Sequence, residues 1–384
     1  MMQLSFDKIN DYFPFHRTEV KRNFLSLILL ICQNKTCNLF KLADHAQWEG
    51  KFESSYTKLI RFFRIKAISE FNFGISLLLF KFCLSLGAKY LIIDRTNWKK
   101  GNKGVNILTL GFLLSNKVFI PIGWADLEGR GNSSTQARID ILNKLKKLYE
   151  FCKLEVPNLT LLADREFIGK EWFSWLAESK IGFTVRLRSK NYLSHWEDEL
   201  DTVCDDILKD ISKHLNKNKY YSKKMEIEGN VFYFSARKTS DQEDPILYLL
   251  STNSDPEEAA MEYKMRWAIE TFFKNLKSNG FNLESLNFKK PEKIELLLGI
   301  VTICYVLAIR EGYKVEEEKG VVFKQSKGKV WKAKSVFRTG LTAILKQIKS
   351  GEQLIRFVIE FISSFKDKEI NKEIDYFDQN LKSV

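Results

Sequence analysis

The chain lacks the features that mark a membrane or secreted protein. It contains only 6 Pro and no low-complexity tract. Its two strongly apolar runs, Phe24–Cys32 and Leu296–Ile309, are shorter than the roughly 20 residues that span a bilayer, so we predict that they form buried helices. The N-terminus lacks the basic and then apolar order of a signal peptide. We therefore expect a cytoplasmic protein with no membrane partner.

Cysteine and histidine are few and scattered. The 6 Cys include no C-x-x-C pair, and the 4 His lie far apart along the chain. This excludes the ligand spacing of a structural zinc site, and a disulfide framework is not expected in a chain of this length. No P-loop of the form G-x-x-x-x-G-K-[ST] occurs either, so nothing predicts ATP binding.

Positive charge is plentiful. Lys and Arg number 61 against 48 Asp and Glu, which gives a net charge of +13 over 384 residues. Such an excess favours a polyanionic partner, because each cation that meets a phosphate releases condensed counterions. The alternative is a protein that is basic for unrelated reasons. The length predicts two or three structural units.

The first 86 residues are predicted to be helical. Phe24–Ile31 has the composition of a core helix, and residues 54–64 carry apolar residues at helical spacing. Four basic residues accompany the second segment: Lys58, Arg61, Arg64 and Lys66. Such a helix suits either a DNA surface or an ordinary solvated face, and the sequence does not separate the two.

From Lys89 the pattern changes to that of an α/β unit. Two short apolar runs each end in a carboxylate, at Asp94 and Asp164. Between them we predict two strands, residues 106–114 and 117–124, joined by a tight turn, and a helix over 136–149. A helix over 169–178 and a strand over 181–187 follow. A three-stranded meander followed by crossover helices is the element order of a ribonuclease H-like fold, which brings acidic strand ends together.

The remaining chain completes three predicted regions. Residues 190–245 are charged and predicted to be a β-rich insertion, with a strand pair around a Gly229-Asn230 turn. A buried strand over 246–251 and a helix from about Pro256 resume the core. The predicted division is a helical DNA-binding region over 1–86, a ribonuclease H-like catalytic domain over 87–310, and a helical region over 311–384 suited to dimerisation.

The helix after Pro256 carries a line of polar residues. At about 100° per residue, Tyr263, Arg266, Glu270 and Lys277 fall within an arc of roughly 60° and form a line about 21 Å long. The opposite side is apolar. This arrangement would let cations bind phosphates while the carboxylate holds a metal ion; a solvated helix face is the alternative.

The spacing of these four residues, Y-x-x-R-x-x-x-E-x(6)-K, is similar to the YREK signature of the insertion-sequence-four family of DDE transposases. Two earlier blocks also resemble that family: LIIDRTNW, which holds Asp94, and LLADREFIG, which holds Asp164. The resemblance covers about residues 87 to 310 in the order expected. The family also uses an insertion-domain tryptophan to hold a flipped base, but no local motif assigns that role to Trp196.

The resemblance implies a chemistry and a set of partners. Asp94, Asp164 and Glu270 would be the catalytic carboxylates and would hold two Mg²⁺ ions, for which Mn²⁺ substitutes. The substrate would be double-stranded DNA, both the terminal inverted repeats of a transposon and the target. The reaction would be nicking, hairpin formation, hairpin opening and strand transfer by a homodimer. The implied location is the cytoplasm of a bacterium, at the nucleoid.

The side chains around the carboxylates have predicted roles of their own. Tyr263, Arg266 and Lys277 would contact DNA phosphates. Arg165 would either touch phosphate or pair with a carboxylate, and Glu166 is a candidate for supporting the site. Trp98 and Trp267 are predicted to pack rather than to stack on bases.

Two rival functions are considered. A domesticated, DNA-binding repressor would keep the fold without transposition, although all three carboxylate positions are intact. A carboxylate enzyme such as a glycosidase would use an acid and base pair. The net charge of +13 argues against a neutral sugar as its substrate.

Overall fold

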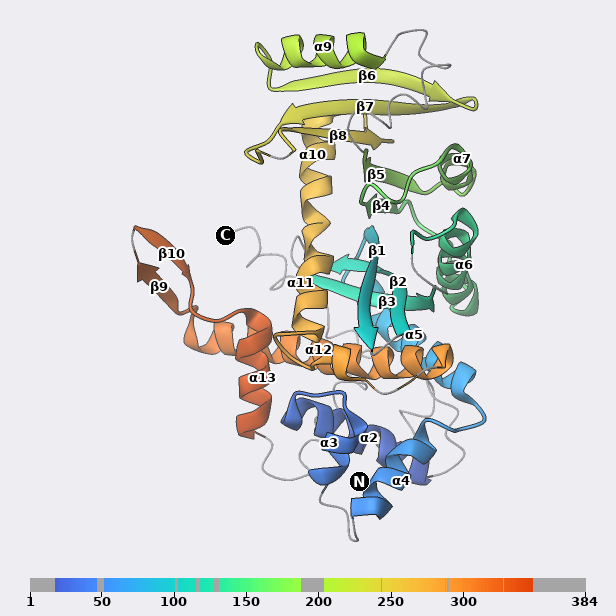
Figure 1. Ribbon diagram of the computed structural model, residues 1–384, viewed down its shortest axis with the longest axis vertical. Helices are drawn as coiled ribbons and strands as arrows, with labels where there is room; N and C mark the ends of the chain where they lie inside the picture. The colour runs from blue at the N-terminus through green and yellow to red at the C-terminus, as the bar shows by residue number, and fades with distance from the viewer. Residues whose placement is uncertain are drawn as a thin grey trace.

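One large sheet organises the molecule (Figure 1). The computed structural model describes residues 18–46, 52–100, 103–114, 118–127, 131–187, 204–242, 244–286, 288, 290–326 and 328–347. The strand order in the sheet is β3-β2-β1-β4-β5-β8-β7-β6. In chain order the strands are β1 Tyr90–Lys100, β2 Lys103–Leu114, β3 Val118–Asp126, β4 Thr160–Ala163, β5 Gly182–Arg186, β6 Tyr220–Ile227, β7 Asn230–Lys238 and β8 Ile246–Ser251.

The directions of the strands confirm the predicted ribonuclease H-like α/β fold. β1, β2 and β3 form an antiparallel meander. β4 and β5 then add in parallel to β1, and helices α6 (Thr135–Phe151) and α7 (Lys170–Glu178) make the crossovers. Both helices lie on one side of the sheet (Figure 1). Strands buried on both faces need continuous apolar sequence, which β4 provides.

Two details of the strands differ from the prediction. β1 does not end at its aspartate but continues to Lys100, because β2 pairs with it along its whole length. The hairpin between β6 and β7 turns at Glu228-Gly229, both with positive φ, one residue before the predicted Gly229-Asn230 pair. The predicted turn at residues 115–116 lies outside the described residues.

The part of the predicted insertion that the structure describes, from residue 204 on, joins the central sheet through β6 and β7. β7 pairs with β8, which pairs with β5, so β6 and β7 extend the sheet at one edge. Helix α9 (Cys204–Leu215) packs on this edge and contacts both β6 and β7. Trp196, to which no base-holding role was assigned, is outside the described part of the chain.

Two consecutive helices form a column beside the sheet (Figure 1). α10 (Pro256–Met265) begins with Pro at its first turn, and the Asp255 side chain accepts hydrogen bonds from the N–H groups of Glu257 and Glu258. This is a satisfied N-cap. α11 (Trp267–Leu276) continues in nearly the same direction. The short 3₁₀ helix Leu283–Ser285 follows.

The C-terminal region is not wholly helical. α12 (Pro291–Lys319) is a 29-residue helix, and α13 (Val336–Gln347) packs against it. Between them lies an unpredicted hairpin, β9 (Phe323–Ser326) and β10 (Lys329–Lys332), which forms its own two-stranded sheet. Of the predicted helical region over 311–384, the structure describes residues only as far as Gln347.

The N-terminal helices are α2 (Thr18–Asn34), α3 (Leu39–Asp44), α4 (Phe52–Phe62) and α5 (Ile68–Ser85), as predicted for that region. Within the described chain, α5 is the one helix whose length and apolar composition would allow a membrane crossing. It packs against α12 and β3, and residues such as Leu78 and Phe80 are fully buried. These contacts are those of a core helix.

Candidate active site

Two carboxylates lie next to each other where β1 and β4 stop pairing. The parallel register places Ile93 beside Ala163, so the residues that follow them, Asp94 and Asp164, are neighbours. Asp94 remains within β1, whereas Asp164 begins the loop after β4. Two apolar strands with the same register therefore position both carboxylates, and this proximity was predicted from the sequence.

The third carboxylate comes from α11. Glu270 lies in its first turn, four residues after Arg266. Arg266 stands between α10 and α11 with φ −51° and ψ −29°. Its N–H donates to the Tyr263 carbonyl and its carbonyl accepts from the Ile269 N–H, so the hydrogen bonds here span three residues. The helix tightens locally to a 3₁₀ turn at this point, which the assumption of a uniform helix did not predict.

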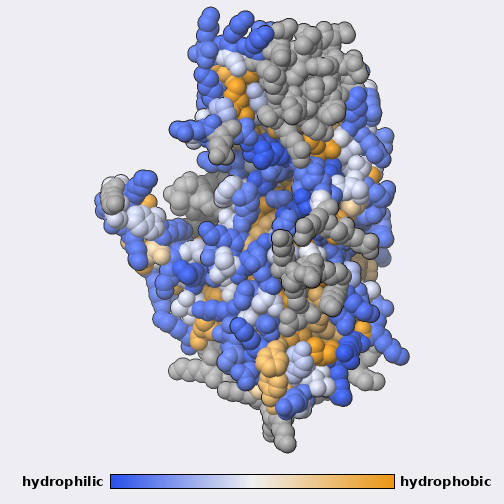
Figure 2. All heavy atoms as spheres, in the orientation of Figure 1, coloured by the Kyte–Doolittle hydropathy of each residue, from blue (hydrophilic) through white to orange (hydrophobic). Residues whose placement is uncertain are grey.

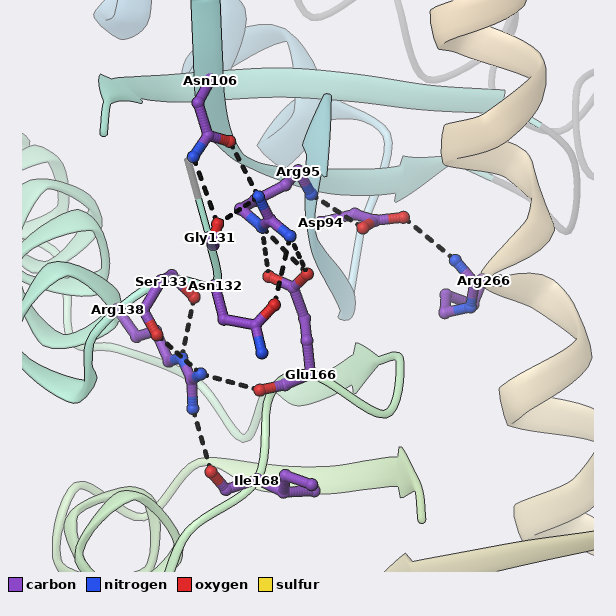
Figure 3. Close-up of polar contacts among 10 residues, drawn as sticks. All are labelled: Asp94, Arg95, Asn106, Gly131, Asn132, Ser133, Arg138, Glu166, Ile168 and Arg266. Carbon is purple, nitrogen blue, oxygen red and sulfur yellow. Dashed lines mark hydrogen bonds and ion pairs between the residues drawn. The ribbon is translucent and has the colours of Figure 1, made fainter. Parts of the chain in front are cut away.

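Arg266 joins two of the three carboxylates. Its Nη1 is 3.1 Å from Oδ2 of Asp94, and its Nη2 is 2.6 Å from Oε1 of Glu270. The arginine is buried, with 6% of its surface exposed. Figure 3 shows it reaching from the helix to Asp94. One guanidinium thus brings Asp94 and Glu270 to the same place.

Tyr263 reaches the remaining carboxylate. Its hydroxyl donates to Oδ1 of Asp164 at 3.0 Å, and the ring lies 5.5 Å from the Arg266 guanidinium carbon. Tyr263 is also buried. The polar line on this helix therefore faces the sheet and its carboxylates, so the alternative of a solvated face is wrong for these residues.

Opposing effects give the two aspartates different proton affinities. Burial raises the pKa of Asp94 to about 7, although Arg266 and the Arg95 N–H act in the other direction. Burial also acts to raise the pKa of Asp164, but Arg266, the Arg165 N–H and the Tyr263 hydroxyl outweigh it and lower that pKa below its ordinary value. The positive charge near Asp94 therefore does not offset the effect of burial on its carboxylate, whereas the groups around Asp164 do offset it.

Lys277 lies apart from the other residues of the predicted line. It follows the end of α11 with a ψ of −94°, so it does not continue the helix. Its Nζ donates to the Asn97 carbonyl at 2.9 Å, pairs with Glu284 at 3.4 Å and lies over the Trp98 ring. The predicted continuous line of four side chains therefore ends at Glu270. Lys277 stands further along β1.

A second arginine near Asp164 was missed by sequence reasoning. Arg186 ends β5, interacts electrostatically with Tyr263 and Asp164, and forms an ion pair with Asp244. Arg165 pairs with the same Asp244 at 3.6 Å, so of its two predicted roles the structure has the carboxylate contact. A charged residue at the end of an apolar strand, as at Arg186, was the available signal.

A buried carboxylate fixes α10 to the sheet beside this site. Glu262 accepts a hydrogen bond from the Thr184 hydroxyl at 2.6 Å and one from the Tyr90 hydroxyl at 3.4 Å. Thr184 and Arg186 lie two residues apart on β5 and so face the same side. This contact sets the position of α10, and with it that of the next residue, Tyr263.

A polar network supports the two aspartate segments from below (Figure 3). Arg95, next to Asp94, donates from Nε and Nη2 to Glu166 at distances of 2.7–2.9 Å. Glu166 is two residues after Asp164. Arg138 of α6 donates to the backbone carbonyls of Glu166 at 2.7 Å and Ile168 at 3.1 Å. The network ties β1 to the loop after β4, which makes Glu166 a supporting residue.

We expect Glu166→Gln to weaken both stability and activity. The change removes the negative charge from a two-pronged ion pair whose side chains are 14% and 15% exposed. The partly buried Arg95 is then left without an anionic partner. The expected loss in unfolding free energy is about 2 kcal/mol, measurable by urea denaturation. Any activity that needs both Asp94 and Asp164 should fall further than the loss of stability explains, because the two segments are no longer held together.

Glu295→Gln is the matched control for that variant. Its ion pair with Lys144 is 3.2 Å long and more exposed, so its loss should cost at most about 1 kcal/mol. Equal effects of the two substitutions would contradict a special role for the Arg95–Glu166 pair.

The two tryptophans of the aspartate and glutamate segments differ in exposure. Trp98 is buried, as the packing interpretation predicted. Trp267 is 63% exposed and lies directly after Arg266, so the packing interpretation is wrong for it. The first residue of α11 therefore presents an aromatic side chain to solvent.

The donor set suits a divalent cation of the Mg²⁺ type. Mg²⁺ prefers carboxylate oxygens, and the site offers them from Asp94, Asp164 and Glu270 on three elements. Within the described ranges no three His, Cys, Asp or Glu side chains already form a metal-binding cluster, and the Arg266 guanidinium stands between Asp94 and Glu270. The residues fit such an ion provided that Arg266 moves aside.

Comparison with known proteins agrees with this geometry. A search of curated proteins finds no match. The model of the transposase DDE domain matches residues 85–307, which include β1, β4, α11 and all three carboxylates. Because the match spans more than half of the 384 residues, the chain belongs to the transposase DDE domain family.

Proposed function

We propose that this protein is a cut-and-paste DNA transposase of the insertion-sequence-four, YREK-signature type, with Asp94, Asp164 and Glu270 as its catalytic carboxylates. Membership of the DDE family supports a transposase-type polynucleotidyl transferase. The observation that carries the finer proposal is the contact of Arg266 with both Asp94 and Glu270, at 3.1 and 2.6 Å. The signature places Arg266 four residues before Glu270, and in the structure the same arginine contacts Glu270 and Asp94 together.

Arg266 has two roles in this proposal. Without DNA, its guanidinium neutralises Asp94 and Glu270, whose charges would otherwise repel each other in a buried site. With two Mg²⁺ ions held by Asp94, Asp164 and Glu270, those carboxylates no longer need it. The guanidinium is then free to bind a phosphate in two-pronged fashion.

The bound ions would activate the attacking oxygen and stabilise the leaving oxygen of an in-line displacement. The chain's own residues position the substrate. Tyr263 donates its hydroxyl to Asp164 and would offer it to a phosphate oxygen of bound DNA instead. Arg165 is half-exposed and can reach backbone phosphates nearby. Lys277 would contact the same strand further along, near the end of β1.

The reaction we propose has four displacements at one site: nicking to expose a 3′-hydroxyl, hairpin formation, hairpin opening and strand transfer. The partners are transposon inverted repeats and target DNA, held by a homodimer in the cytoplasm. The proposed division of labour is end binding by residues 1–86, chemistry by 87–310 and dimer contacts by 311–384. The described part of the insertion, β6 and β7, extends the same sheet.

The test uses the purified chain with the inverted repeats that flank its gene. We expect Mg²⁺-dependent nicking at the repeat end, then a hairpin visible on denaturing gels, and no product in EDTA. Binding without nicking, in Mg²⁺ and in Mn²⁺, would favour a domesticated repressor and overturn the proposal. Nicking without any hairpin would keep the DDE chemistry and remove only the hairpin step.

A further inference from the structure

The hairpin β9–β10 stands clear of the body of the molecule at the left of Figure 1. Its base is closed by a hydrogen bond from the Ala333 N–H to the Val322 carbonyl at 2.8 Å. Lys332 ties it to α12 through Glu316 at 3.2 Å. Two short strands alone are marginally stable in water. The two attachments named above both lie at the base of the hairpin, so a partner bound to its outer part would add stability.

Large apolar side chains on this hairpin are exposed. Val322, Phe323, Val330 and Trp331 have between 47% and 69% of their surface in solvent. Hydrophobic and hydrophilic residues lie side by side at this edge of the molecule in Figure 2. Exposed aromatic and aliphatic residues gathered in one projection indicate an interaction surface.

The charge of the segment is of one sign. Residues 320–336 contain five Lys and no Asp or Glu. The register places Lys324 opposite Trp331, and Lys329 opposite Ser326. Directly paired residues of an antiparallel hairpin share a face, so one face presents an indole, two ammonium groups and a hydroxyl. Among the described residues neither Lys324 nor Lys329 has an acidic partner.

We propose that this face of the hairpin is a second DNA-contacting surface, a β-ribbon that binds duplex phosphates apart from the carboxylate site. The inference rests on the proposed function, which supplies DNA as the partner. A two-stranded ribbon fits the major groove, lysines pair with phosphates, and the Trp331 indole packs against sugars and base edges. A second copy of the chain fits less well, because two proteins of charge +13 would bring lysines together.

The test measures binding of a short labelled duplex of arbitrary sequence by the full chain in EDTA, where no cleavage occurs. Each phosphate contact contributes about 0.9 to the slope of log affinity against log salt. Lys324→Gln/Lys329→Gln should therefore reduce the slope by about 1.8 and weaken binding about tenfold. Trp331→Ala should also weaken binding, whereas Trp331→Phe, which keeps an aromatic ring, should retain most of the wild-type affinity.

Lys147→Gln/Lys153→Gln is the matched control, since it removes the same charge from exposed positions on and after α6. It should leave the slope at the wild-type value. Equal slopes for the two double variants would overturn the proposal, as would a change in oligomeric state by light scattering with no change in DNA binding. Lysine-dependent binding by a protein that never nicks would sink the proposed transposase activity and leave the hairpin surface standing.

Discussion

Asp94→Asn, Asp164→Asn and Glu270→Gln should each abolish Mg²⁺-dependent cleavage of repeat ends. Each change removes one negatively charged ligand from the two proposed Mg²⁺ ions while keeping the shape of the side chain. Loss of several kcal/mol of transition-state stabilisation lowers the rate by about a thousandfold or more. Single-turnover cleavage on denaturing gels measures this directly. Binding of uncleaved DNA in EDTA should remain close to that of the wild type.

The control for these variants is Asp140→Asn. Asp140 is an exposed carboxylate of α6 whose side chain accepts a hydrogen bond from Gln136 at 2.8 Å. Its substitution removes one negative charge at a position outside the site. This variant should cleave at the wild-type rate. The assignment is wrong if any one of the three carboxylate variants also does so. Thermal unfolding of each variant separates loss of chemistry from loss of fold.

The central fold could be predicted because its signals are local. A buried parallel strand is a short apolar run, and two such runs ended at Asp94 and Asp164. The fold class then predicted that the two carboxylates meet, and the observed register, Ile93 beside Ala163, brings them together. The length of β1 could not be predicted, because its second half is held by pairing with β2. The place of β6 and β7 in the same sheet depends on long-range pairing that leaves no local pattern.

The candidate site was predicted in its members but not in its contacts. Helical periodicity placed Tyr263, Arg266 and Glu270 on one face, and the structure brings all three to the aspartates. A uniform helix also placed Lys277 on that face, but the chain leaves the helix there. Periodicity says which side a residue faces and not what it meets. The pairing of Arg266 with two carboxylates, and the position of Arg186, needed the tertiary structure.

Gly340→Ala should destabilise the C-terminal region far more than Gly123→Ala destabilises the sheet, although each adds one methyl group. A Cβ at Gly340 of α13 would lie 1.7 Å from the Ala308 carbonyl oxygen and 2.5 Å from the Gly312 nitrogen, both on α12. These atoms are backbone, so a side-chain rotation cannot relieve the clash and the helices must separate. Overpacking ordinarily costs 1–3 kcal/mol, so we expect a loss of about 3 kcal/mol or more in unfolding free energy.

Gly123→Ala is the matched control, because its Cβ would meet only the Ile141 side chain at 3.6 Å, an ordinary contact. It should change the unfolding free energy by less than about 1 kcal/mol. Urea denaturation compares the two variants. The hairpin β9–β10 connects α12 to α13, so separation of these helices also changes the orientation of the hairpin. Gly340→Ala should therefore weaken duplex binding, whereas Gly123→Ala should not. Wild-type stability of Gly340→Ala would show that the two helices do not pack backbone to backbone.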